Sequence, residues 1–203
     1  MGPLSRDGAG NFHPQFCRQQ YLATHIYDTP IARGMSSIRI DLPSDKAAII
    51  LKRIQNRLST YKGYKVGADA RVSAQALADD IGKRIDVSLT NFKAAIDNLE
   101  MYDKQEEMKK AGEVYKKIQN LKDNKVVLPS EPYLVVQEDL QKFYLLDELG
   151  FTNSIDLLDN INSFRSASIS GECDVSVLEK INGNIDKIGS FFAEKSQSLM
   201  KKG

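Results

Sequence analysis

The chain has 203 residues, of which 41% are apolar, and this is enough for the core of one sizeable domain. Lysine and arginine number 28 against 27 aspartate and glutamate, for a formal net charge of +1. Proteins that bind nucleic acid nonspecifically usually carry a clustered basic excess, which this composition does not support. No run approaches the roughly 20 apolar residues of a membrane span, and the N-terminus lacks the apolar region of a secretory signal. We therefore expect a protein that is cytoplasmic, or secreted without a classical signal peptide.

The first residues, 1–36, differ from the rest of the chain because Gly, Pro and polar residues recur there without periodicity. We interpret them as an irregular N-terminal segment. A natural start at Met35, with residues 1–34 foreign to the native protein, stays open. The alternation of residues 37–42 is typical of one short strand, although six residues are few for a strand. The helical domain is expected over 37–203.

The first helix is expected over residues 45–61, after a stop at Pro43 and an N-cap at Ser44. Its apolar residues recur at spacings of three and four, as on one face of an amphipathic helix: Leu51, Ile54, Leu58 and Tyr61. Two glycines, Gly63 and Gly67, follow closely and predict a loop.

Residues 73–100 allow two interpretations. The letters LADDIG and VSLTNFKAAIDNL resemble the two halves of a helix-turn-helix, which would make the protein a DNA-binding regulator. However, one apolar stripe with spacings of three and four runs through the supposed turn at Lys83–Asp86: Leu77, Ile81, Ile85, Leu89, Phe92, Ile96 and Leu99. A turn would rotate the apolar face. Gly82 alone favours a turn, and a lone helical glycine costs only about 1 kcal/mol. We predict one continuous core helix.

The charge of the would-be recognition helix supports the same interpretation. From Val87 to Glu100 it has one basic residue, Lys93, and two acidic residues, Asp97 and Glu100. Phosphate attraction supplies much of the affinity for DNA, and this surface would supply little. Asn91 is the one side chain of the type that reads adenine. Binding of DNA is therefore the alternative, not the first prediction.

The next stretch, downstream of residue 103, is strongly polar but regains an apolar stripe: Ala111, Val114, Ile118 and Leu121. No proline occurs between residues 44 and 128. Residues 70–122 are therefore expected either as one long helix, with coiled-coil-like packing, or as a hairpin that reverses near 103–107.

Two further helices are predicted after a proline-containing break. The first covers 131–149 and ends at Gly150, because glycine commonly terminates a helix. The second covers 154–164, with Thr152 or Asn153 as its N-cap.

The last predicted helix carries the most regular apolar pattern, an a/d seam over three heptads in which Lys195 occupies the skipped position. Such a seam can be donated to a protein partner or to a second copy of the chain. The candidate partner-binding residues are Leu178, Ile181, Ile185, Ile188, Phe192 and Leu199.

Chemistry-bearing residues form no specific pattern. His13, Cys17 and His25 could pair as thiol and imidazole, or touch a metal, but their spacing matches no known ligand set. Cys17 and Cys173 are far apart and are expected as free thiols. Adjacent carboxylates are expected on solvated helix faces: Asp79-Asp80, Glu106-Glu107, Glu138-Asp139 and Asp147-Glu148. We predict no catalytic, cofactor or metal site.

Together these patterns predict an all-α fold, an antiparallel bundle of five to six helices with an irregular N-terminal segment. The first functional hypothesis is a non-enzymatic protein–protein interaction module, such as an adaptor, structural or assembly protein. The alternatives are a DNA-binding regulator and a secreted bacterial effector that acts on a host protein.

Overall fold

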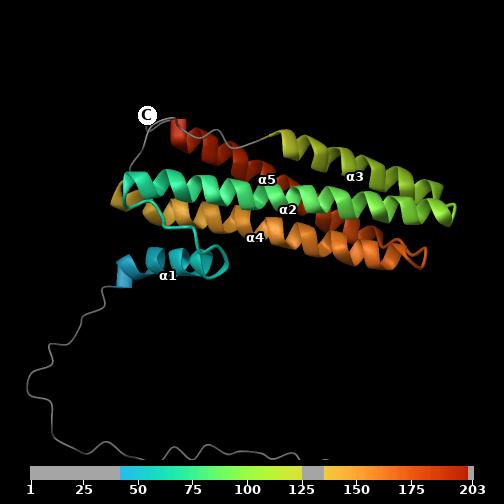
Figure 1. Ribbon diagram of the computed structural model, residues 1–203, viewed down its shortest axis with the longest axis horizontal. Coiled ribbons are helices and arrows are strands. Elements are labelled where there is room, and N and C mark those ends of the chain that lie inside the picture. Colours follow the sequence, from blue (N-terminus) through green and yellow to red (C-terminus); the bar gives the residue numbers. More distant parts are fainter. Residues whose placement is uncertain (1–41, 125–134, 201–203) are drawn as a thin grey trace, which may run out of the picture. The chain divides into compact units, whose positions relative to one another are not determined.

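The computed structural model describes residues 42–124 and 135–200, and these form five helices with no strand among them (Figure 1). The elements are α1 (Leu42–Arg57), α2 (Gly67–Met101), α3 (Gln105–Asp123), α4 (Gln137–Ser168) and α5 (Val175–Met200). The predicted all-α helical bundle is confirmed. Among the described residues, none of the helices combines the length and the apolar character needed to cross a membrane.

Four of the helices pack in a ring. α2 contacts α3 and α4, and α5 contacts the same two helices, while α1 packs on α4 alone. α2 and α4 run in one direction, and α3 and α5 run in the other (Figure 1). All five helices belong to one compact unit, residues 40–203.

Helix α2 is continuous through Lys83–Asp86, so the helix-turn-helix geometry is absent and the prediction of one core helix is confirmed. Its apolar stripe faces the other helices: Leu77, Ile81, Ile85, Phe92 and Leu99 are buried. Gly82 costs the fold little, because a Cβ at this position would meet nothing within 4 Å. The long-helix alternative for 70–122 is wrong, and the hairpin is correct. The chain reverses over residues 102–104, where Asp103 adopts a φ of 54°.

Helix α4 differs from its prediction. It runs unbroken through Gly150, so the expected helix end at Gly150 and the expected N-cap at Thr152 or Asn153 are both wrong. A Cβ on Gly150 would lie 2.5 Å from the ring of Phe191 on α5. The glycine therefore serves close approach of two helices and not termination. Asn153 lies inside the helix, where its Nδ2 donates to the carbonyl of Leu149 at 2.8 Å.

The N-terminal predictions have mixed outcomes. Helix α1 ends at Arg57 and not at residue 61, which leaves Tyr61 in the connection to α2. The expected strand at 37–42 lies outside the described residues except for Leu42, which begins α1. The residues His13, Cys17 and His25 also lie outside the described part of the chain.

Candidate functional site

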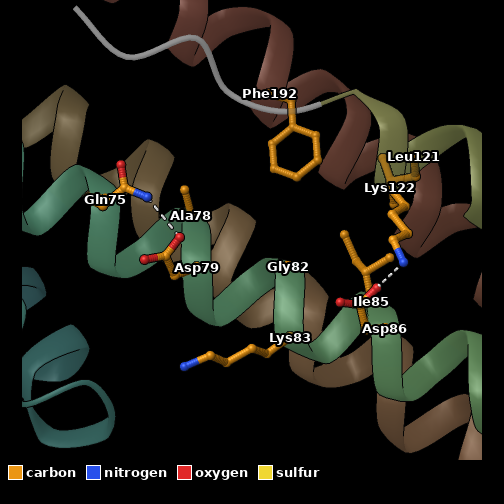
Figure 2. A pocket seen from close by; sticks show the side chains of 10 residues that line it. All are labelled: Gln75, Ala78, Asp79, Gly82, Lys83, Ile85, Asp86, Leu121, Lys122 and Phe192. Atoms are coloured by element: carbon orange, nitrogen blue, oxygen red, sulfur yellow. Dashed lines mark hydrogen bonds and ion pairs between the residues drawn. The ribbon is translucent and has the colours of Figure 1, made fainter. Parts of the chain in front are cut away.

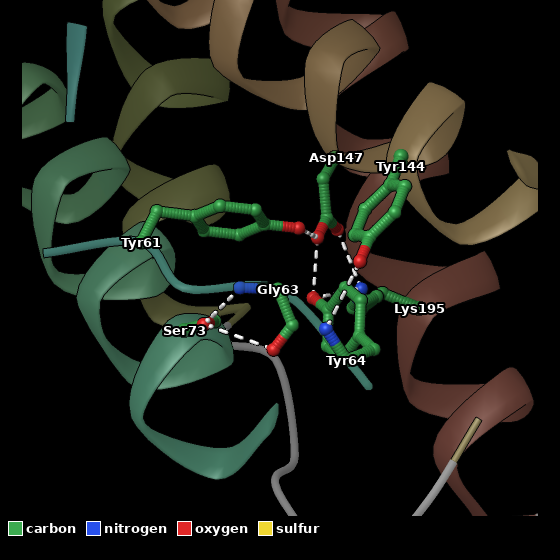
Figure 3. A network of polar contacts seen from close by, with 7 residues as sticks. All are labelled: Tyr61, Gly63, Tyr64, Ser73, Tyr144, Asp147 and Lys195. Carbon is green, nitrogen blue, oxygen red and sulfur yellow. Dashed lines mark hydrogen bonds and ion pairs between the residues drawn. The ribbon is translucent and has the colours of Figure 1, made fainter. Parts of the chain in front are cut away.

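A buried ion pair joins α4 to α5 near the start of α2 (Figure 3). The Nζ of Lys195 lies 2.5 Å from an Oδ1 of Asp147, and the two residues are 1% and 0% exposed. Removing two charges from water is costly, and a buried pair persists only when further hydrogen bonds complete it.

Two tyrosines complete this pair from the connection between α1 and α2. The hydroxyl of Tyr61 donates to Oδ2 of Asp147 at 2.5 Å, and the hydroxyl of Tyr64 donates to the same oxygen. Lys195 Nζ also donates to the Tyr64 hydroxyl at 2.6 Å. The backbone N–H of Tyr64 donates to the Tyr144 hydroxyl at 3.2 Å. Both carboxylate oxygens of Asp147 therefore accept hydrogen bonds inside the protein.

The backbone conformation of the connection between α1 and α2 directs the side chains of Tyr61 and Tyr64 toward Asp147. The hydroxyl of Ser73 accepts the backbone N–H groups of Lys62 and Gly63, each at 2.8 Å (Figure 3). Gly63 adopts a φ of 92°, a region that side chains disfavour. A Cβ there would also lie 2.6 Å from the hydroxyl of Tyr144. The glycine in this loop is thus required by both conformation and space.

Burial alters the ionisation of these groups. Burial lowers the pKa of Lys195, and the nearby carboxylate of Asp147 opposes the shift. Burial raises the pKa of Tyr61 well above its ordinary value, and the charge of Asp147 raises it further. Burial likewise raises the pKa of Tyr144. The ammonium also lies over the ring of Tyr64, 4.3 Å from its centroid, which favours the charged form.

We call this network the clamp; its side chains are Tyr61, Tyr64, Tyr144, Asp147 and Lys195. It is not a reaction site, because a substrate would need access to groups that have almost no exposed surface. It fastens the connection between α1 and α2 to α4 and α5. The prediction that Asp147 lies on a solvated face is wrong, whereas its neighbour Glu148 is partly exposed and pairs with Arg53 at 3.5 Å. The sequence contains one indication of this burial. Asp147 is four residues from both Phe143 and Phe151, so it shares a helix face with two aromatic residues that are buried.

A groove of about 380 Å³ lies where α2, the end of α3 and α5 meet (Figure 2). Ile85, Leu121 and Phe192 give it an apolar lining. At its rim Asp86 pairs with Lys122 at 2.7 Å, so these charges already satisfy each other. The groove can admit an apolar side chain, and the charged residues Asp79 and Lys83 also line it.

The predicted partner-binding stripe of α5 lies inside the bundle. Its members from residue 178 to 192 are buried: Leu178, Ile181, Ile185, Ile188 and Phe192. The side chain of Leu199 lies outside the described part of the chain. In the single chain the stripe already packs within the bundle, where α5 contacts α3 and α4. Binding of a partner by the same stripe stays a prediction, and it would require the bundle to open.

The residues weighed for DNA contact are engaged within the protein. Asn91 Nδ2 donates to Asn162 on α4 at 2.8 Å, and Arg165 donates to Asn91 at 3.0 Å. Lys93 pairs with Asp97 on its own helix at 3.1 Å. The hydrogen bonds of Asn91 join α2 to α4, whereas the Lys93–Asp97 ion pair lies on the surface of α2.

The two most exposed large apolar side chains of the described residues, Met101 and Ile169, lie at the end of the bundle opposite the clamp. Here the turn between α2 and α3 meets the loop between α4 and α5 (Figure 1). Met101 is 82% exposed, Ile169 65% and Tyr102 49%. The Tyr102 hydroxyl donates to the Ile169 carbonyl at 2.8 Å. We call these three residues the apolar tip.

Glycine also shapes this end. Gly171 has a φ of 75°, and a Cβ there would lie 2.7 Å from the ring of Tyr102. The ring therefore rests on backbone, and the two loops hold one another in place. Within the described residues, no group of three or more His, Cys, Asp or Glu side chains is arranged to hold a metal ion.

Comparisons with known proteins give no relative: no protein-family model, curated protein or solved structure matches this chain.

Proposed function

We propose that this protein is a non-enzymatic helical module that binds another protein through its apolar tip. The observation that carries the proposal is the exposure of two large apolar side chains at one end of the bundle. Met101 ends α2 and precedes Tyr102, and the hydroxyl of Tyr102 donates to the carbonyl of Ile169. Apolar surface left in water stabilises a complex when a partner covers it.

The rest of the bundle suits the role of a rigid support. The clamp holds its charged groups away from solvent, and the helices bury a common core that includes Phe92, Phe151 and Phe191. Because the tip is fixed by the contacts of Tyr102 with Ile169 and Gly171, little ordering would be required on binding.

The test starts with proximity labelling by the full chain in its cells of origin and continues with purified candidates. Each candidate is titrated against the full chain by calorimetry. We expect at least one to bind, and the double variant Met101→Ser/Ile169→Ser to weaken that binding about tenfold, or ~1.4 kcal/mol.

The matched control removes apolar surface from the side of α2. Val72 and Val87 are also about half exposed, and Val72→Ser/Val87→Ser should leave the affinity unchanged. The proposal fails if no purified candidate binds, or if the two double variants weaken binding equally.

A further inference from the structure

We infer that α1 covers a second binding surface, a face of α4 that takes an amphipathic helix of another protein when α1 is released. This surface lies at the clamp end of the bundle, away from the apolar tip. α1 lies outside the ring of four helices and contacts α4 alone (Figure 1). Because each helix of the ring is held by at least two neighbours, α1 is the helix that can leave with the fewest contacts broken.

The attachment of α1 to α4 is small. Of the described side chains of α1, Ile50 and Ile54 are buried, whereas α2 buries ten residues. Arg53 pairs with Glu148 of α4 at 3.5 Å, but 64% of the arginine side chain is exposed, and such a pair contributes little to stability. A groove of about 290 Å³ also remains between the last turn of α1 and α4, where Ile54 and Phe151 line it. The two helices are therefore not closely packed there.

The clamp allows α1 to leave while the connection to α2 stays in place. Between α1 and the clamp, Ser59 and Thr60 are exposed. The connection is fastened after them, because Tyr61 and Tyr64 are fully buried and donate to Asp147 (Figure 3). The boundary between a detachable helix and an anchored loop therefore lies at the two exposed residues.

α1 itself shows which ligand the covered face accepts. It places two buried aliphatic side chains four residues apart, Ile50 and Ile54, on α4, and Arg53 meets the carboxylate of Glu148. Release of α1 would expose more of Phe151, which is now 1% exposed, and a partner helix would cover this ring again. We therefore expect an amphipathic helix with aliphatic anchors at the same spacing and a basic residue beside the second anchor.

Hydrogen exchange of the full chain, resolved by residue, measures the release. We expect amides of α1 to exchange at least about a hundredfold faster than those of α4, because opening of α1 breaks fewer contacts than global unfolding. The amide of Tyr64, which donates to the Tyr144 hydroxyl, should exchange as slowly as the ring. One common slow rate for α1 and α4 would show that α1 does not open by itself and would overturn the inference.

A matched pair of variants separates release of α1 from unfolding of the chain. Ile54→Asp places a charge at a position that is 1% exposed and should release α1, whereas Ile49→Asp makes the same change at a position that is 51% exposed. Exchange should become faster in α1 of Ile54→Asp alone, with α2, α4 and α5 unchanged. If Ile54→Asp unfolds the whole chain, α1 is an integral part of the core and the inference is wrong.

A labelled peptide of residues 42–58 tests the uncovered face as a binding site. By fluorescence anisotropy we expect the peptide to bind Ile54→Asp at least about tenfold more tightly than the native chain or Ile49→Asp, because their own α1 occupies the site. The same peptide with Ile50→Asp and Ile54→Asp should not bind. Equal affinity for all three chains, or binding to none of them, would overturn the covered site.

The apolar tip is separated from this surface by one further variant. Met101→Ser/Ile169→Ser, added to Ile54→Asp, should leave the affinity for the peptide unchanged. A loss of binding would show that the peptide binds at the tip and that the second surface is wrong. Failure of the tip to bind a partner leaves the peptide experiment unaffected, so the two proposals fail independently.

Discussion

The two ends of the bundle place charge and apolar surface in opposite ways. At the clamp, Lys195 and Asp147 are buried, and tyrosines satisfy them. At the tip, Met101 and Ile169 are exposed, and the exposed carboxylate of Glu100 forms no ion pair within the described residues. A buried charge must find its partners within the fold, because water cannot replace them. An exposed carboxylate has no such requirement, because water solvates its charge.

The clamp also depends on a close approach of α4 and α5. Gly150 lies three residues after Asp147, and Phe191 lies four residues before Lys195. The contact of the Phe191 ring with the backbone at Gly150 therefore lies one helical turn from the ion pair. The glycine sets the helix separation at which the ammonium can reach the carboxylate.

The largest expected effect comes from breaking the clamp. Lys195→Met leaves Asp147 buried without its cation, and we expect the free energy of unfolding in urea to fall by about 3–5 kcal/mol. Lys195→Met/Asp147→Leu should recover a large part of this loss, because it removes the uncompensated charge. If both variants were equally unstable, the ion pair would not be the source of the effect.

A smaller loss is expected from Gly150→Ala. The new Cβ would overlap the ring of Phe191, and such overpacking costs about 1–3 kcal/mol. Gly112→Ala is the matched control, since a Cβ there meets nothing within 4 Å, and it should gain about 0.5–1 kcal/mol from helix propensity. Urea titrations of the two variants should therefore move in opposite directions. Stabilisation by both substitutions would show that the helices can separate without cost.

Alkaline pH provides a third test of the clamp. The pKa of Tyr61 is raised in the folded protein, so its contribution to stability is fully present below pH 10, the ordinary pKa of tyrosine, and is lost at higher pH. The lowered pKa of Lys195 acts in the opposite sense, because its cost is relieved as the pH rises toward 10.5. Comparison with Tyr61→Phe isolates the tyrosine.

We expect the difference in unfolding free energy between the native protein and Tyr61→Phe to shrink by about 1 kcal/mol between pH 10 and pH 11. Urea titrations at the two pH values measure it. A difference that is constant with pH would mean that the Tyr61 hydroxyl ionises equally well in the folded and unfolded chain.

The smallest effect on stability is expected at the tip. Met101→Ser/Ile169→Ser removes side chains that contribute little to the core, and its unfolding free energy should stay within about 0.5 kcal/mol of the native value. A loss above roughly 2 kcal/mol would place these residues among the structural ones and would weaken the case for a binding surface.

Sequence periodicity alone determined that the chain is helical and that α2 is continuous. The side chains of a helix return to the same face every three to four residues, and the stripe from Leu77 to Leu99 kept this spacing through Gly82. The apolar seam of α5 was likewise visible, because burial along a helix leaves the same local pattern whatever the partner is.

Tertiary structure alone decided what the exceptions to these patterns mean. Gly150 resembled a helix end, but its role depends on Phe191, which lies far away in the sequence. From the sequence, Asp147 is expected on a solvated face, and Lys195 interrupts the apolar seam of α5. In the fold the two side chains form a buried ion pair. A stripe is a property of one segment, whereas an ion pair, a close contact or an exposed tip is a property of two segments, and only packing determines which segments meet.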